Sequence, residues 1–143
     1  MREILLVNGP NLSRLGQRKP EIYGTDTAAD IRARLERLAE RRASTLTAFQ
    51  SNHEGEIIDF IEAHFGALAM IVNPGALMMS GWALRDTLEE FPGYVIEVHI
   101  SNIYARETFR HRSLLSAVVD GQVCGLGTLG YDLALDYLLN LRR

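Results

Sequence analysis

A long loop near the start of the chain brings a tyrosine together with several cations. The stretch NGPNLSRLGQRKPEIYG (8 to 24) follows the apolar run EILLV and contains Arg14, Arg18, Lys19 and Tyr23. A phenol ordinarily loses its proton near pH 10, so a tyrosine that acts as a base at neutral pH needs positive charge beside it. Arg18 is the natural source of that charge, and a glycine-rich loop can close over a substrate. The stretch therefore indicates a base on a closing lid, with an ordinary surface loop as the alternative.

The run YVIEVHIS (94 to 101) carries a second candidate catalytic group, a histidine. Side chains alternate along a strand, so Glu97 and His99 point to the same face. A carboxylate in that position can orient an imidazole and favour its protonated form, which is what a general acid requires. A histidine with a purely structural role remains the alternative.

The residues that follow this histidine can hold an anion. Ser101 offers a hydroxyl, and Arg106 and Arg110 lie a few residues further on. Arginine binds carboxylates through two parallel hydrogen bonds, so this segment predicts a carboxylate contact. A solvated, arginine-rich surface is the alternative interpretation.

Alternating apolar runs and amphipathic segments supply the elements that position these residues. Five runs predict strands, at 3–9, 44–51, 68–75, 94–101 and 121–127. Apolar residues at helical spacing predict helices at 27–42, 54–65 and 80–91, a further helix is expected at 128–143, and residues 106–118 could hold a shorter one. Such alternation is typical of α/β proteins, and we expect a flavodoxin-like three-layer sandwich whose five-stranded parallel sheet has the order 2-1-3-4-5. We expect residues 1–143 to form a single catalytic domain.

Ligands of such sheets bind beyond the carboxyl ends of the strands. Polar and glycine residues follow all five predicted strands, namely Asn8, Asn11, Ser51, Asn52, His53, Asn73, His99, Ser101, Gly125 and Gly127. Any one of them is a common turn residue. Their convergence on one edge of the sheet predicts a binding site there.

Composition limits the class of partner and compartment. The chain has a net charge of −3 and a single cysteine, Cys124, so it has neither the basic character of a nucleic-acid-binding protein nor a set of cysteines for a metal. No apolar run approaches the roughly 20 residues of a membrane span, and the sequence start lacks a signal-peptide pattern. We expect a cytoplasmic protein that acts on a small molecule, without nucleic acid or membrane.

Six segments in order resemble the type II 3-dehydroquinate dehydratase family. They are NGPNLSRLGQRKPEIYG, FQSNHEGEIIDFI, VNPGA, ALRDTL, VIEVHISNIYARETFRHRS and GLGTLGYDLAL, and together they span nearly the whole chain. The resemblance implies a lyase of the shikimate or quinate pathway that dehydrates 3-dehydroquinate to 3-dehydroshikimate through an enolate. It also implies an anionic substrate, no metal or organic cofactor, and a homo-oligomer of trimers, commonly four in a dodecamer.

The resemblance assigns roles to individual residues. Tyr23 matches the base and Arg18 the arginine that activates it, while Asn11 matches the amide that stabilises the enolate through a bound water. His99 matches the acid that protonates the departing hydroxyl, with Glu97 behind it.

The resemblance also implies a set of substrate-binding residues. Asn73, Ile100 and Ser101 match the pocket for the substrate carboxylate, and Arg110 matches a further contact. Asp86 matches a residue that family members receive from a neighbouring subunit.

One segment departs from the family pattern. The chain reads LMMSGW after NPGA, with Met78 and Met79 where the family has threonine and a substrate-binding histidine. A thioether cannot donate a hydrogen bond, and losing a buried partner costs about 1 to 3 kcal/mol. We favour an active dehydratase. The alternatives are a paralogous dehydratase of a related cyclic hydroxy-ketone and a non-catalytic flavodoxin-like binding module, although NGPN after the first strand is not a flavin phosphate loop.

Overall fold

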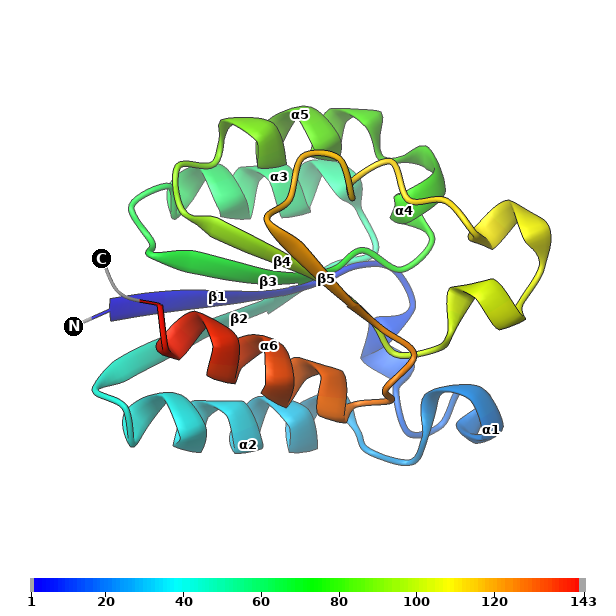
Figure 1. The fold of residues 1–143 in the computed structure, drawn as a ribbon, viewed down its shortest axis with the longest axis horizontal. Helices are drawn as coiled ribbons and strands as arrows, with labels where there is room; N and C mark the ends of the chain where they lie inside the picture. Colours follow the sequence, from blue (N-terminus) through cyan, green and yellow to red (C-terminus); the bar gives the residue numbers. More distant parts are fainter. Residues whose placement is uncertain (1, 142–143) are drawn as a thin grey trace.

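Five parallel strands form the central sheet of the computed structural model, which describes residues 2–141 (Figure 1). The strands are β1 (Arg2–Asn8), β2 (Ser44–Gln50), β3 (Ala69–Asn73), β4 (Tyr94–His99) and β5 (Gly121–Cys124). Their order is β2-β1-β3-β4-β5, and every neighbouring pair is parallel. The predicted flavodoxin-like sheet is thereby confirmed.

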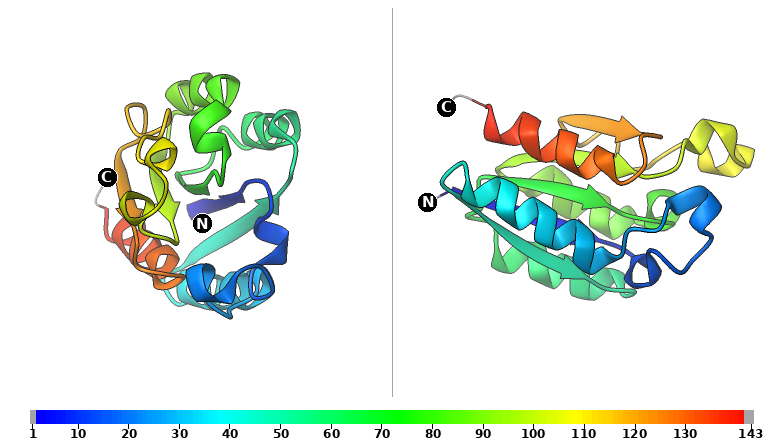
Figure 2. Two further views of the ribbon diagram at one scale, coloured as in Figure 1. Left: turned by 90° about the vertical axis from the view of Figure 1, so that its right-hand side faces the viewer. Right: turned by 90° about the horizontal axis from the view of Figure 1, so that it is seen from below.

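Helices cover both faces of this sheet (Figures 1 and 2). One face packs against α2 (Ala28–Glu40) and α6 (Leu129–Leu139), and the other against α3 (Glu54–Ala63) and α5 (Trp82–Glu90). Along β1, Ile4 and Leu6 enter the first core while Leu5 and Val7 enter the second. The central strands β1, β3 and β4 are buried on both sides and form continuous apolar runs, whereas the edge strands β2 and β5 are only partly buried.

The carboxyl end of the sheet carries short elements that the sequence analysis did not predict. The loop after β1 contains the 3₁₀ turn η1 (Leu12–Arg14) and the one-turn helix α1 (Pro20–Tyr23). A separate turn, α4 (Leu77–Ser80), precedes α5, so the predicted 80–91 helix begins at Trp82. These short elements surround the mouth of the site.

The helix predicted at 106–118 was wrong. The segment forms one 3₁₀ turn, η3 (Thr108–Arg110), followed by an irregular loop (Figure 1, yellow to orange), and a second 3₁₀ turn, η2 (Ile103–Ala105), lies just before it. Its backbone groups bond outside any helix, because the Leu114 N–H donates to the Met78 carbonyl at 2.7 Å. The Ser113 hydroxyl accepts from the Leu115 N–H at 3.1 Å. Tertiary bonding thus overrides the weak helical spacing.

The C-terminal helix also ends earlier than predicted, at Leu139 rather than residue 143. The Asn140 side chain donates to the Asp136 carbonyl at 2.8 Å, and the Asn140 backbone N–H donates to the same oxygen at 3.2 Å as the last turn closes. Arg2 and Arg42 donate to the Leu139 carbonyl at 3.3 and 3.2 Å, and these cations complement the negative end of the helix. Residues 142 and 143 of the predicted helix lie outside the described residues.

None of the helices within residues 2–141 has both the length and the apolar character needed to cross a membrane.

Candidate active site

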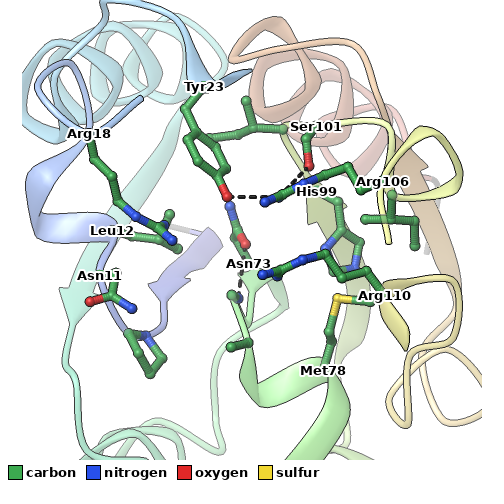
Figure 3. Close-up of a pocket in the computed structure, with 15 residues that line it drawn as sticks. Asn11, Leu12, Arg18, Tyr23, Asn73, Met78, His99, Ser101, Arg106 and Arg110 are labelled. Atoms are coloured by element: carbon green, nitrogen blue, oxygen red, sulfur yellow. Dashed lines mark hydrogen bonds between the residues drawn. The ribbon is translucent and has the colours of Figure 1, made fainter. Parts of the chain in front are cut away.

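A cavity of about 240 Å³ lies at the carboxyl end of the sheet, between the loops that follow β1, β3 and β4 (Figure 3). It brings together most of the catalytic and substrate-binding residues that the family resemblance implied, namely Asn11, Arg18, Tyr23, Asn73, His99, Ile100, Ser101 and Arg110, whereas Asn8, Ser51, Asn52, His53, Gly125 and Gly127, also predicted at the strand ends, do not line it. Glu97 lies behind His99 on β4. Asp86 is exposed on α5 and does not line this cavity.

Two glycine loops form the back of the cavity at the switch point between β1 and β3. A Cβ on Gly9 would lie 2.3 Å from the Pro74 carbonyl oxygen, so only glycine allows these backbones to approach. Gly75 has a φ of +57°, and the Gly9 N–H donates to the Asn73 carbonyl at 2.8 Å. The close contact fixes the two loops that carry Asn11 and Asn73.

Tyr23 projects into the cavity from α1 and is nearly buried. Nη1 of Arg106 donates to its hydroxyl oxygen at 2.8 Å (Figure 3). The Arg18 guanidinium lies over the ring instead, with its carbon 4.9 Å from the ring centroid. Two cations therefore flank the phenol, as the predicted base requires. The cation that contacts the phenol oxygen is Arg106, for which the sequence predicted a contact with the substrate carboxylate instead.

Arg106 is itself held in place from both ends. The same Nη1 donates to the Ser101 hydroxyl at 3.3 Å, and Nε2 of His111 lies 3.0 Å from the Arg106 carbonyl oxygen. The Arg106 side chain is only 14% exposed, so its charge acts in a partly desolvated site where it is weakly screened.

His99 and Glu97 meet as the alternation of β4 predicts. The two side chains are 5% and 0% exposed, and Nε2 of the imidazole hydrogen-bonds Oε2 of the carboxylate. The Ser116 hydroxyl donates to the other oxygen, Oε1, at 3.0 Å. With Nε2 engaged by Glu97, Nδ1 is the ring nitrogen that can serve a ligand in the cavity.

Asn11 occupies a left-handed conformation at the start of η1, with a φ of +70°. Its backbone N–H donates to Oδ1 of Asn52 at 3.0 Å, and its own Oδ1 accepts from Arg14 at 2.6 Å. The amide oxygen is therefore occupied, which leaves the Nδ2 hydrogens to face a negatively charged group.

The cavity is electropositive although the chain is acidic overall. Arg18, Arg106 and Arg110 all line it. Glu107 at the rim accepts from Arg110 Nε at 2.9 Å. Its own backbone N–H, and then Arg110, hold the pKa of the Glu107 carboxyl below its usual range. The arrangement suits a small anionic ligand.

The two methionines that depart from the family pattern occupy different environments. Met78 is 3% exposed and lines the cavity. Met79 lies in a separate surface depression with Trp82, Phe109 and Leu114. Of the two methionines, Met78 is therefore the one that faces the cavity, while Met79, at the position of the family's substrate-binding histidine, lies outside it.

Beneath the cavity, the hydroxyl of Tyr131 joins Asn73 to Asn8. It accepts from Asn73 Nδ2 at 2.8 Å and donates to Asn8 Oδ1 at 2.8 Å. Burial raises the pKa of Tyr131 above the ordinary tyrosine value of 10.0. The hydroxyl therefore stays protonated while the protein is folded.

This burial predicts an alkaline loss of stability. Below about pH 10 both the folded and unfolded states hold the Tyr131 proton, so the residue adds no pH dependence. Above that pH the unfolded chain releases the proton while the folded chain keeps it, and the free energy of unfolding falls by roughly 1 kcal/mol per pH unit. Urea unfolding between pH 9 and 11 should show a shallower fall in Tyr131→Phe than in wild type. Equal slopes would contradict the prediction.

Three contributions to the site were missed by sequence reasoning. The contact of Arg106 with Tyr23 depends on the fold of η2 and η3, and nothing in the sequence pairs these distant residues. Nothing in the sequence indicated that Ser116 would contact Glu97 either. Tyr131 offered one, because a hydroxyl at a buried position of an otherwise apolar helix face must find a partner. Across residues 2–141, no cluster of three or more His, Cys, Asp or Glu side chains could hold a metal ion.

Comparisons with known proteins identify the family of this chain. The family model described as Dehydroquinase class II matches residues 2–139. A 3-dehydroquinate dehydratase from Bacillus licheniformis is 50% identical over 141 residues, which cover 98% of this chain and 97% of the relative. One from Corynebacterium pseudotuberculosis is 51% identical over 140 residues, with 95% of each chain covered.

Solved structures extend the likeness to three dimensions. The type II dehydroquinase from Propionibacterium acnes superposes with a TM-score of 0.94 at 40% identity, covering 99% of this chain and 98% of the other. The enzyme from Butyrivibrio crossotus gives a TM-score of 0.93 at 39% identity, covering 96% and 97%. Matched along nearly its whole length in both sequence and structure, the chain belongs to the class II dehydroquinase family.

Proposed function

We propose that this protein is a type II 3-dehydroquinate dehydratase, a lyase that removes water from 3-dehydroquinate to give 3-dehydroshikimate. The observation that carries the proposal is the position of Arg106 Nη1, 2.8 Å from the Tyr23 oxygen, in a cavity that is also lined by His99, with Glu97 hydrogen-bonded behind that histidine. A base with a cation on its oxygen and a histidine with a carboxylate behind it are the two proton-transfer groups that such an elimination needs.

Tyr23 is the proposed base. As a phenolate, its oxygen removes a proton from the carbon beside the substrate ketone, and the bonding electrons move onto the ketone oxygen to form an enolate. The N–H of Arg106 stabilises the negative charge on the phenolate, and Arg18 adds a second cation over the ring. The free Nδ2 group of Asn11 stabilises the enolate, in the proposed arrangement through a bound water.

His99 is the proposed acid. When the enolate re-forms the ketone, the hydroxyl on the next carbon leaves, and His99 donates a proton so that it departs as water. Glu97 orients the ring and stabilises its cationic form before this transfer, and Ser116 holds Glu97. The product is a conjugated enone.

The substrate carboxylate is proposed to bind at the end of β4. Asn73, Ile100 and Ser101 line the cavity and offer side-chain and backbone donors, and Arg110 adds a cation. These residues form an electropositive pocket, which favours the binding of an anionic cyclic substrate.

The direct test is the absorbance of the conjugated enone after purified protein is mixed with 3-dehydroquinate. We expect sustained turnover in the wild type and little change in Met79→His, because Met79 lies outside the cavity. An inactive wild type, with activity appearing in Met79→His, would favour the paralogous dehydratase of a related hydroxy-ketone. Inactivity of both proteins would contradict the proposed function.

A homo-oligomer, built as trimers and then a dodecamer, is the proposed assembly. Within residues 2–141, seven large apolar or aromatic side chains are 44 to 61% exposed: Trp82, Tyr104, Phe109, Leu126, Leu129, Leu133 and Tyr137. Trp82 and Asp86 are one helical turn apart on α5, so a neighbour packed on Trp82 would also meet Asp86. This supports a contribution of Asp86 to a neighbouring cavity.

Replacing Trp82 with glutamate is expected to reduce the size of the assembly, because it puts a charge into the proposed interface. Light scattering coupled to gel filtration should give wild-type mass as a multiple of 16.0 kDa. Trp82→Glu should give smaller species. Glu89→Ala, an exposed change on the same helix, should leave the mass unchanged. A monomeric wild type would contradict the proposed assembly.

We further propose that the chain forms a single catalytic domain. We propose that it works in the cytoplasm, in aromatic biosynthesis or in quinate breakdown. The lone, partly exposed Cys124 is compatible with a reducing compartment.

A further inference from the structure

A fully buried hydroxyl lies directly behind the cavity. Tyr131 belongs to α6 and is 0% exposed, packed within the core between this helix and the sheet. Its oxygen is 2.8 Å from Asn73 Nδ2 and 2.8 Å from Asn8 Oδ1. These two asparagines end β3 and β1, the strands on either side of the switch point. The C-terminal helix therefore reaches the back of the site through one phenol oxygen.

The direction of every hydrogen bond in this group is determined. The Gly75 N–H donates to Asn73 Oδ1 at 3.2 Å, so the Asn73 amide must turn its nitrogen toward Tyr131. The tyrosine oxygen then accepts that bond and gives its only hydrogen to Asn8 Oδ1. An asparagine nitrogen has two hydrogens, and Tyr131 uses one of them. The other is available to a ligand, since Asn73 lines the cavity (Figure 3).

We propose that Tyr131 is a positioning residue for the dehydration, whose hydroxyl fixes the Asn73 amide in the orientation that presents an N–H to the substrate. Tyr131 does not line the cavity, so it acts through Asn73 rather than on the substrate. This inference rests on the proposed function, in which Asn73 binds the substrate carboxylate. It adds a residue more than a hundred positions beyond Tyr23 to the machinery of the site.

Packing alone does not explain a tyrosine at this position. Phenylalanine would fill the same apolar core without burying a hydroxyl, and a buried hydroxyl is tolerated only when it is hydrogen-bonded. Tyr131 makes both bonds to asparagines that are themselves buried, at 4% and 7% exposure. Because burial also raises the pKa of Tyr131, the hydroxyl keeps its hydrogen, and hence the donor order, throughout the neutral pH range.

Steady-state kinetics on four full-length proteins tests the inference: wild type, Tyr131→Phe, Asn73→Ala and the double variant. In Tyr131→Phe we expect KM to rise roughly 5- to 50-fold with kcat within about threefold, because a binding contact is loosened while the base and acid stay in place. Asn73→Ala should raise KM at least as much. The double variant should match Asn73→Ala, since Tyr131 acts through that amide.

Tyr137→Phe is the matched control. It removes a hydroxyl from the same helix at a residue that is 54% exposed, and both KM and kcat should stay at wild-type values. A wild-type KM in Tyr131→Phe would overturn the inference. Additive losses in the double variant would overturn it as well, because Tyr131 would then be acting on the fold rather than through Asn73.

A measurement without substrate separates this inference from the proposed function. The side-chain amide protons of Asn73, observed by NMR, should exchange with solvent at least about tenfold faster in Tyr131→Phe than in wild type. If Tyr131→Phe does not fold, Asn8→Ala removes the acceptor at the far end of the chain of bonds and should speed the same exchange. Unchanged exchange would overturn the inference even in a protein that turns over 3-dehydroquinate. An inactive wild type with faster exchange in the variant would instead contradict only the proposed function.

Discussion

Replacing Tyr23 with phenylalanine is expected to lower kcat for 3-dehydroquinate by about 10²- to 10⁴-fold, the usual contribution of a general base. The variant keeps the ring that packs against Arg18 but loses the oxygen that Arg106 contacts. Because the substrate still meets the arginines and Asn73, KM should change much less than kcat.

Enone absorbance under saturating substrate measures this effect. Tyr104→Phe is the matched control, since that tyrosine is 61% exposed and its hydroxyl should not matter. If Tyr23→Phe retained a kcat within about threefold of wild type, another group would have to be the base.

Arg106→Ala is expected to lower kcat by about 10²- to 10³-fold, the effect of removing one preorganised donor to a developing anion. The variant leaves the Tyr23 oxygen without its 2.8 Å hydrogen bond and the Ser101 hydroxyl without its donor. Arg106→Lys keeps the charge but cannot reproduce the planar guanidinium contacts, so it should recover only part of the rate.

Arg112→Ala is the control for this prediction. Arg112 follows closely in the same segment but lies in the depression beside Met79, outside the cavity. Its loss should leave kcat near the wild-type value in the same enone assay. A wild-type rate in Arg106→Ala would show that the contact with Tyr23 is incidental.

The sheet was predictable because its signals are strong and local. The central strands β1, β3 and β4 are buried on both faces and give uninterrupted apolar runs, and the amphipathic helices between strands imply parallel connections of one hand. The positions of Asn73 and His99 follow directly, because each is the last residue of its strand. Glu97 faces His99 for the same reason, since side chains two apart share a face of the strand.

The short elements above the sheet were not predictable in this way. The predicted helix at 106–118 failed because Leu114 bonds to the carbonyl of Met78, a partner more than thirty residues away. The position of Arg106 on Tyr23 depends on that same loop structure. Whether Met78 or Met79 faces the cavity depends on the rotation of a one-turn helix, α4, and a four-residue segment has no periodic pattern that could reveal it.

The hydrogen bonds of the buried Tyr131 could not be predicted for a third reason. Its position on an apolar helix is evident from the sequence, but its partners come from β1 and β3, at the other end of the chain and in its middle. Only the packing of α6 across the sheet brings these groups together.

Hydrogen exchange in D₂O at the carbon beside the substrate ketone, followed by NMR in His99→Ala and Tyr23→Phe, tests most directly whether Tyr23 is the base and His99 the acid. Tyr23 makes the enolate and His99 releases the hydroxyl, so His99→Ala should still exchange this proton while forming little enone. Tyr23→Phe should stop both exchange and dehydration. Exchange at the wild-type rate in Tyr23→Phe, or its loss only in His99→Ala, would contradict the assignment of base and acid.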